Sequence, residues 1–215
     1  MMIRNAAACL LLLLGSAFAS EAHASSLESD VLAEVNFARA HPRDYADELR
    51  RYRDSFDGNI AHPDDDSTGV ATHEGSSAVD EAIDFLEAQR PLQPLAASAL
   101  LARGAGDLVS DQGPRGGIGH VTSGGRNPGQ RVRQRNGDIY VSEVISYGVP
   151  DAAGVVRQLI VDDGVRRRGH RVLLFSAMFN FAGVSCGGHE VYGSMCVMDL
   201  AATRDGSVPM PKDRN

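Results

Sequence analysis

Two cysteines near the C-terminal end of the chain could carry covalent chemistry. Cys186 and Cys196 lie in two segments of strand character, residues 179–186 and 194–200, which the turn-rich residues 187–193 join. An even pair of cysteines in an oxidising compartment normally forms a disulfide. The spacing therefore predicts a disulfide across a hairpin, with two free buried thiols as the alternative.

The N-terminal residues 1–24 indicate the compartment. Arg4 precedes an apolar run over residues 6–14, and residues 22–24 (Ala-His-Ala) have the small-x-small pattern of a signal-peptide cleavage site. The run is shorter than the roughly 20 residues of a membrane-spanning helix. We expect a cleaved signal peptide, a mature chain that is secreted or periplasmic, and no stable transmembrane anchor.

Other motif-like segments predict little chemistry. Residues 183–187 fit the G-x-S-x-G hydrolase pattern, but that motif needs a helix after its strand, and here a second strand follows. Residues 64–69 have the acidic start of a calcium loop, yet Gly75 stands where the loop needs a glutamate. The three arginines 166–168 could attract an anionic ligand such as a phosphate or an envelope polymer, or form a solvated surface. The sequence contains no H-E-x-x-H, Walker or dinucleotide motif.

The composition favours one secreted domain. The 215 residues are 43% hydrophobic and 23% charged, with a formal net charge of −7. A chain of this length buries roughly 70% of its unfolded surface, which is enough for a sizeable core. Because nucleic acids and anionic membranes demand a cationic face, the excess of acid disfavours both as partners. We expect a single domain over residues 25–215, and the sequence leaves its oligomeric state open.

Helices should dominate the first part of this domain and strands the last. Apolar spacing and capping residues predict helices over residues 25–38, 42–56, 76–90, 101–112, 127–137 and 151–160, and an extended segment over 139–146. Ser25 and Glu28 can form a capping box at the first of these helices. Residues 57–75 are polar and aperiodic, so we expect an inserted, exposed loop. Helices on either side of a small C-terminal sheet predict an α/β layered domain.

Several short motifs follow one another in an order that is similar to a known family. They are Asn36 to Pro42, Gly119-His120, Gly124-Gly125, Ser142 to Gly148, Leu159 to Gly164, Gly169-His170-Arg171 and Gly183-Val184. Together they cover most of the mature chain and resemble the CAP superfamily (cysteine-rich secretory proteins, antigen 5, pathogenesis-related proteins), as a bacterial member with an SCP domain. This chain departs from the family pattern at Ser142 and Val144, lacks the tryptophan common in the penultimate helix, and can form only one disulfide.

The resemblance implies a three-layer α-β-α sandwich of CAP/SCP type, with a small antiparallel sheet and a cleft that holds two histidines and two acids. His120 and His170 match the histidine positions, and Glu143 matches one acidic position. Asp162 or Asp163 stands where many relatives carry the other acid. Because His120, Glu143 and His170 lie in glycine-containing or element-terminal segments, we expect them to converge on one cleft.

The resemblance also implies the chemistry of that cleft. Two imidazoles with a carboxylate suit zinc or another divalent cation, so the expected metal ligands are His120, His170 and Glu143. The implied function is a secreted binding module for a small-molecule, lipid-like or cell-envelope ligand. The alternative is an extracellular hydrolase, either metal-dependent or with a histidine as base and Glu143 orienting it or activating water. Because no serine or cysteine nucleophile is evident beside either histidine, we favour the binding module and leave enzyme activity open.

Overall fold

The chain folds as a mixed α/β domain in a computed structural model, which describes residues 26–63 and 68–209. The expected signal peptide lies outside these residues. The helices are α1 (Leu27–Ala40), α2 (Pro42–Arg53), α3 (Ser76–Ala88), α4 (Ala99–Gln112), α5 (Pro128–Gln134), α6 (Ala152–Val161) and α7 (Gly169–Leu174), with the 3-10 turns η2 (Gly113–Arg115) and η3 (Arg166–Arg168). The strands are β1 (Phe56–Asp57), β2 (Ile60–Ala61), β3 (Val70–Ala71), β4 (Ala96–Ala97), β5 (Ser142–Tyr147), β6 (Phe181–His189) and β7 (Gly193–Ala201).

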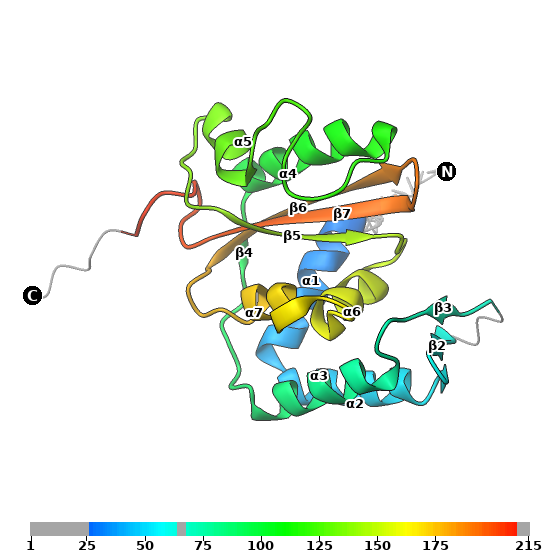
Figure 1. Cartoon of the computed structure of the whole chain (residues 1–215). Coiled ribbons are helices and arrows are strands. Elements are labelled where there is room, and N and C mark those ends of the chain that lie inside the picture. The colour runs from blue at the N-terminus through cyan, green and yellow to red at the C-terminus, as the bar shows by residue number, and fades with distance from the viewer. Residues whose placement is uncertain (1–25, 64–67, 210–215) are drawn as a thin grey trace, which may run out of the picture.

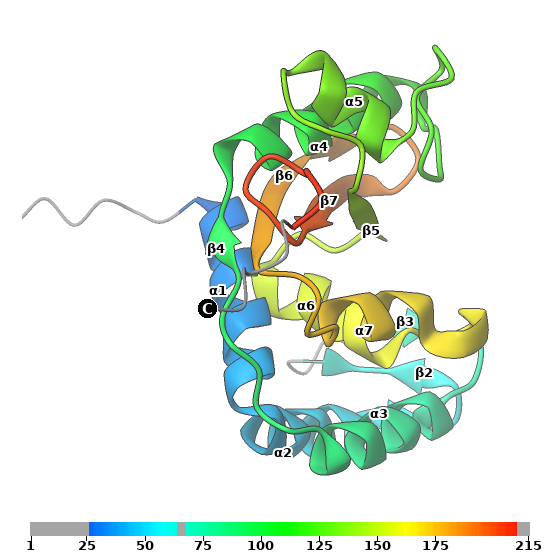
Figure 2. The same cartoon turned by 90° about the vertical axis from the view of Figure 1, so that its left-hand side faces the viewer.

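The central layer is a four-stranded sheet with the order β4-β6-β7-β5. The short strand β4 runs parallel to β6, and the other neighbours are antiparallel. Helices α4 and α5 cover one face, and α1, α6 and α7 cover the other, with α2 and α3 beyond them (Figures 1 and 2). The expected three-layer α-β-α architecture is confirmed.

The central strand β7 shows why this sheet is covered on both faces. Its alternate residues Met195 and Val197 pack under α4 with Leu108, whereas Cys196 and Met198 belong to the larger core on the α1 and α6 side. A strand buried on both faces reads as a continuous apolar run rather than as an alternating pattern. The exception in this run is Asp199, which is fully buried.

Helix α4 packs unusually close to the sheet. A side chain at Gly183 on β6 would place its Cβ 2.0 Å from the main-chain nitrogen of Ala102 on α4. Because such a contact is impossible, only glycine at this position allows the observed approach. The glycine of the G-x-S-x-G pattern at residues 183–187 is therefore a packing residue within a hairpin.

The hairpin formed by β6 and β7 carries the disulfide that the cysteine spacing predicts. Cys186 and Cys196 are direct cross-strand partners with Cα atoms 4.1 Å apart, and their sulfur atoms are bonded. Such a short separation is typical of a non-hydrogen-bonded antiparallel pair. The free main-chain N–H of Cys186 instead donates to Glu28 of α1, at 3.2 Å.

Most predicted helices are confirmed, with small differences at their ends. Ser26 is the N-cap of α1 and accepts a hydrogen bond from the Ser29 amide, and Ser25 of the expected capping box lies outside the described residues. Helix α2 ends at Arg53 rather than near Phe56, whose ring still packs edge-on against Tyr52 at 5.2 Å. Asn127 forms the capping box of α5 with Gln130.

The inserted segment 57–75 is not a simple loop. Strands β1, β2 and β3 pair in order as a small antiparallel sheet beside α2 and α3. The strands are only two residues long, so their pattern is too short to be recognised as a period of two. This small sheet forms one wall of the pocket described below.

The first sequence motif of the family resemblance is structural. Asn36 bonds both the N–H and the C=O of Leu95, which leads into β4. Buried Arg39 donates to the carbonyl oxygens of Gln93 and Leu174. The motif thus ties α1 to the segment before β4 and to the end of α7.

Candidate functional site

His120 lies in the segment between η2 and α5 and contacts the edge strand β5. Its Nδ1 is 2.8 Å from Oε1 of Glu143, whose side chain is only 1% exposed, while the imidazole remains half exposed. The other carboxylate oxygen of Glu143 forms an ion pair with Arg131 of α5. The carboxylate therefore orients the imidazole, and Nε2 of His120 points away from Glu143.

Arg131 is the buried cation that organises this side of the site. Its side chain is fully buried and donates to the carbonyl oxygens of Gly104 in α4 and His120 in the loop, each at 3.0 Å. One side chain therefore links α4, α5, the His120 loop and β5. A guanidinium has five donors in a rigid fork, which suits a junction of this kind.

A second buried acid lies beside this cluster. Asp199 of β7 is the cross-strand partner of Glu143 and lies 3.8 Å from Arg131, and neither of its carboxylate oxygens accepts a hydrogen bond. Burial, and then the neighbouring charge of Glu143, raise the pKa of Asp199 well above its ordinary value. When Asp199 carries a proton it is neutral, and the single positive charge of Arg131 then faces the single negative charge of Glu143.

His170 begins α7 and forms a similar pair with Asp162. Its Nδ1 is 2.7 Å from Asp162 Oδ1, and its main-chain N–H donates to Oδ2 at 2.9 Å. Asp162 ends α6 in the left-handed conformation, with φ of 58°, which is costly for a residue with a side chain. That conformation turns the buried carboxylate toward the start of α7.

Asp163 has a different partner. Its carboxylate accepts the main-chain N–H groups of His73 and Glu74 at 2.7 and 2.8 Å, before α3 begins. Of the two candidate aspartates, Asp162 therefore contacts His170, and Asp163 fixes the segment between β3 and α3.

Arg168 strengthens the same junction. It bonds Glu74 and Glu81, and the charge-assisted bonds lower the pKa of Glu74 to about 2. Arg167 and Arg168 both adopt left-handed backbone, with φ of 67° and 51°. The neighbouring Arg166 and Arg167 are exposed and form no ion pair with a described residue.

A pocket of about 720 Å³ opens beside His170. It lies between the small sheet, the start of α6 and the end of β5, and it includes Asp162 and Asp163 but neither His120 nor Glu143. Tyr147 of β5 connects the two regions, because it lines the pocket while its hydroxyl oxygen accepts the Gly119 N–H at 3.0 Å. The His170–Asp162 pair therefore lines this pocket, and the His120–Glu143 pair lies outside its lining.

The carboxylates that were expected beside the metal already have protein partners. Glu143 and Asp162 each use both carboxylate oxygens on protein partners. Within residues 26–63 and 68–209, no group of three or more histidine, cysteine or acidic side chains could hold a metal ion. What remains suitable is Nε2 of each histidine, since a carboxylate on Nδ1 is the usual partner of a metal-binding imidazole.

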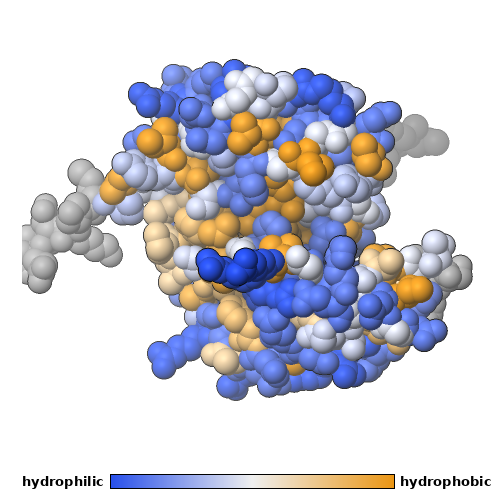
Figure 3. Space-filling model, viewed as in Figure 1, coloured by the Kyte–Doolittle hydropathy of each residue, from blue (hydrophilic) through white to orange (hydrophobic). Residues whose placement is uncertain are grey.

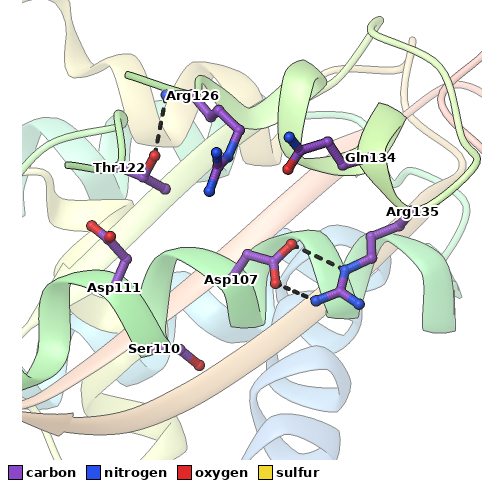
Figure 4. A pocket seen from close by; sticks show the side chains of 7 residues that line it. All are labelled: Asp107, Ser110, Asp111, Thr122, Arg126, Gln134 and Arg135. Carbon is purple, nitrogen blue, oxygen red and sulfur yellow. Dashed lines mark hydrogen bonds and ion pairs between the residues drawn. The ribbon is translucent and has the colours of Figure 1, made fainter. Parts of the chain in front are cut away.

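A second hollow of about 630 Å³ lies between α4 and α5 (Figure 4). Arg126 and Gln134 point toward the face of α4 that carries Asp107 and Asp111, and Arg135 forms an ion pair with Asp107. Its lining consists of polar and charged side chains, and two of them, Arg135 and Asp107, bond one another. We regard the pocket beside His170 as the better candidate, since ligand pockets are mostly apolar with a few polar groups.

Sequence reasoning missed Arg131, Asp199 and the pocket residue Arg157. Asp199 carried a usable signal, because it is a lone acid in an otherwise apolar strand. Arg131 lies in a helix that also carries Arg133, where a buried cation has the same appearance as a solvated one, and Arg157 is a half-buried arginine in the otherwise apolar helix α6. Their roles depend on tertiary contacts.

Comparison with known proteins found no matching family model and no matching curated protein. Structural matches include an outer surface protein of Borrelia burgdorferi, with a TM-score of 0.42 and 16% identity over 58% of this chain and 86% of that one. An extracellular SCP-domain protein of Bacillus anthracis matches with a TM-score of 0.42 and 17% identity, over 59% of this chain and 37% of its own. A cysteine-rich secretory protein of Staphylococcus aureus matches with a TM-score of 0.34 and 15% identity, over 58% of this chain and 36% of its own. Among the described helices, none is long and apolar enough to cross a membrane.

Proposed function

We propose that this chain is a secreted binding module that holds a lipid-like or cell-envelope molecule with an anionic group in the pocket beside His170. The pocket itself carries the proposal. Its volume of about 720 Å³ lies in the range of small-molecule sites. Much of its lining is apolar, including Phe56, Val70, Val149, Pro150, Leu159 and Val165.

One arginine of the pocket lining, Arg157, can meet an anionic group, and the lining also includes Asp151, Asp162 and Asp163. Arg157 of α6 lies over the ring of Tyr52 at 4.5 Å and forms no ion pair with a described carboxylate. The lining acids are already engaged, since Asp162 bonds His170 and Asp151 caps α6 through the Gly154 amide. An apolar chain with an acidic head would therefore meet apolar walls and an available guanidinium.

Secretion is the part of the proposal that the disulfide supports. A bonded Cys186–Cys196 pair is typical of an oxidising compartment. The signal pattern in residues 1–24 of the sequence agrees with export.

A second candidate function is hydrolysis with His170 as general base. The observation that favours it is the hydrogen bond between His170 and buried Asp162. In many hydrolytic sites a histidine base is oriented by an acid in this way. Thr72 carries the aliphatic hydroxyl of the pocket lining, and this hydroxyl donates to the Asn59 carbonyl at 2.8 Å. Water would thus be the nucleophile. A His170→Asn variant that hydrolyses p-nitrophenyl butyrate as fast as the wild type would exclude this function.

Divalent cation binding is a further part of the proposal. Each imidazole would bind a cation through Nε2, with Glu143 orienting the ring of His120 and Asp162 that of His170. The cation would supply a positive charge for an anionic ligand. The chain's own contribution is the two fixed imidazoles on the segments that flank β5.

The binding proposal is tested with cis-parinaric acid, a fluorescent fatty acid. We expect saturable binding to the wild type that weakens about tenfold or more in Arg157→Gln, since a hydrogen bond to a charged group is worth about 1.5–3 kcal/mol. Val70→Asp should also weaken binding, because it places an anion in the apolar wall. Arg133→Gln, an exposed arginine of α5, is the matched control. Equal affinities in all four proteins, or no saturable binding, would contradict the proposal.

A further inference from the structure

Strand β5 ends the main sheet, and one row of its main-chain groups has no partner strand. Gly148 donates its N–H to Ser194 at 2.9 Å, which sets the alternation along the β5–β7 ladder. Ser146 and Val144 must then bond β7, and Glu143, Ile145 and Tyr147 direct their main-chain groups away from it. This outward row is an open sheet edge.

The outward row is largely unoccupied. The carbonyl oxygen of Tyr147 accepts the side-chain amide of Gln158 at 3.1 Å, which closes the row at that end. Among the described residues, the main-chain N–H and C=O of Glu143 and Ile145 have no hydrogen-bond partner. Two donors and two acceptors, alternating along a strand, are complementary to the backbone of another extended chain.

The open row lies in a recess. The His120 loop lies on one side of β5 and α7 on the other, and the space-filling view shows a hollowed band between these two parts (Figures 2 and 3). Glu143 is 5% exposed overall although its side chain is 1% exposed, so its accessible atoms are mainly main-chain atoms. The side chain of Ile145 packs under α4, yet Ile145 also lines the pocket. Its outward main-chain groups explain this second contact.

The charges around the recess are mostly positive. Arg166 and Arg167 are exposed at its α7 side and have no acidic partner among the described residues. The nearby acids Glu143 and Asp162 are buried and paired. In a chain with a net charge of −7, this local excess of cations favours an acidic partner.

We propose that an extended acidic peptide binds along β5 as an added strand, pairing its backbone with Glu143 and Ile145 and its acidic side chains with Arg166 and Arg167. Strand addition of this kind takes its affinity from main-chain hydrogen bonds and its specificity from side chains. The inference does not rest on the proposed pocket ligand, because its contacts are the main chain of β5 with Arg166 and Arg167 rather than Arg157, although Ile145 also lines the pocket.

The test uses a fluorescein-labelled peptide, acetyl-Val-Glu-Val-Glu-Val-Lys(fluorescein)-amide, and a copy with N-methyl groups on alternate residues. Ile145→Pro removes the outward N–H without touching the ladder to β7, a placement that an edge strand tolerates. Ile145→Ala is the matched control, since it loses the same side-chain packing and keeps the N–H. We expect Ile145→Pro to bind at least tenfold more weakly than Ile145→Ala, and the N-methylated peptide not to bind the wild type.

Amide exchange of the wild-type protein gives a readout that does not depend on the folding of a variant. In the free protein the amides of Glu143 and Ile145 should exchange faster than those of Val144 and Ser146. The peptide should slow the first two selectively, and Arg166→Gln with Arg167→Gln should weaken its binding. Unchanged exchange at residues 143 and 145 under saturating peptide, or equal binding by the proline and alanine variants, would overturn the proposal. Phosphatidylglycerol vesicles that bind through the same arginines without slowing these amides would overturn it too.

Discussion

Replacing Arg131 by methionine should destabilise the protein severely. Arg131 is fully buried, and its guanidinium is the positive charge beside Glu143, whose side chain is 1% exposed. Methionine keeps much of the side-chain volume but removes the charge. Glu143 would then remain as a buried anion whose remaining polar partner is His120.

The expected cost is about 3–5 kcal/mol, the usual loss when one partner of a buried ion pair is removed. The carbonyl oxygens of Gly104 and His120 also lose their donor, which raises the expected loss toward the upper value. A second change, Glu143→Leu, removes the stranded anion. The double variant Arg131→Met, Glu143→Leu should therefore be more stable than Arg131→Met alone by at least about 2 kcal/mol.

Urea unfolding at pH 7, followed by circular dichroism, measures these free energies, and unchanged m-values would show that the folded states are comparable. Exposed Arg133→Met is the control and should change the free energy of unfolding by less than about 0.5 kcal/mol. If Arg131→Met costs less than about 1 kcal/mol, or if the double variant is no more stable than the single one, the buried cluster does not act as described.

Three further predictions follow from other parts of the structure. Because burial raises the pKa of Asp199, its protonated form stabilises the fold below the ordinary value near 3.8, and this stabilisation is lost as the pH rises through the raised pKa. The stability of Asp199→Asn relative to wild type should therefore grow by up to about 1.4 kcal/mol per pH unit above pH 4, and a constant difference in urea unfolding from pH 4 to 7 would refute this. Changing Cys186 and Cys196 together to alanine should cost about 2–3 kcal/mol, and two reactive thiols in denatured, unreduced wild type would rule out the bond. Zinc should bind the wild type more tightly than a His120→Ala, His170→Ala variant, and equal calorimetric heats would exclude the two-imidazole site.

The elements with a clear period or cap could be predicted from the sequence. The helix at α6 has both a capping Asp151 and an apolar face, and the structure places it where the pattern indicates. The hairpin and its disulfide follow from strand character and compartment, which are local properties. The small sheet formed by β1, β2 and β3 could not be predicted, because each strand has two residues and its pairing is set by the turns.

The candidate site was predictable as residue types but not as geometry. Glu143, and either Asp162 or Asp163, were expected beside the histidines, and Glu143 and Asp162 each bond Nδ1 of one histidine. The engagement of both carboxylates by other donors depends on Arg131 and on the start of α7. Such contacts join residues far apart in the chain, and no local pattern encodes them. The same is true of Arg157, whose importance arises only from its place in the pocket.

The most direct test of the central claim is an NMR titration of the mature protein with palmitate, observing arginine side-chain and backbone signals. The account predicts shifts that saturate together at Arg157 Nε, Val70, Val149 and His170, all of which line the pocket. The signals of Asp107 and Asp111 in the polar hollow between α4 and α5 should stay unchanged. Saturable shifts confined to that hollow, or no saturable shift at Arg157, would contradict the account.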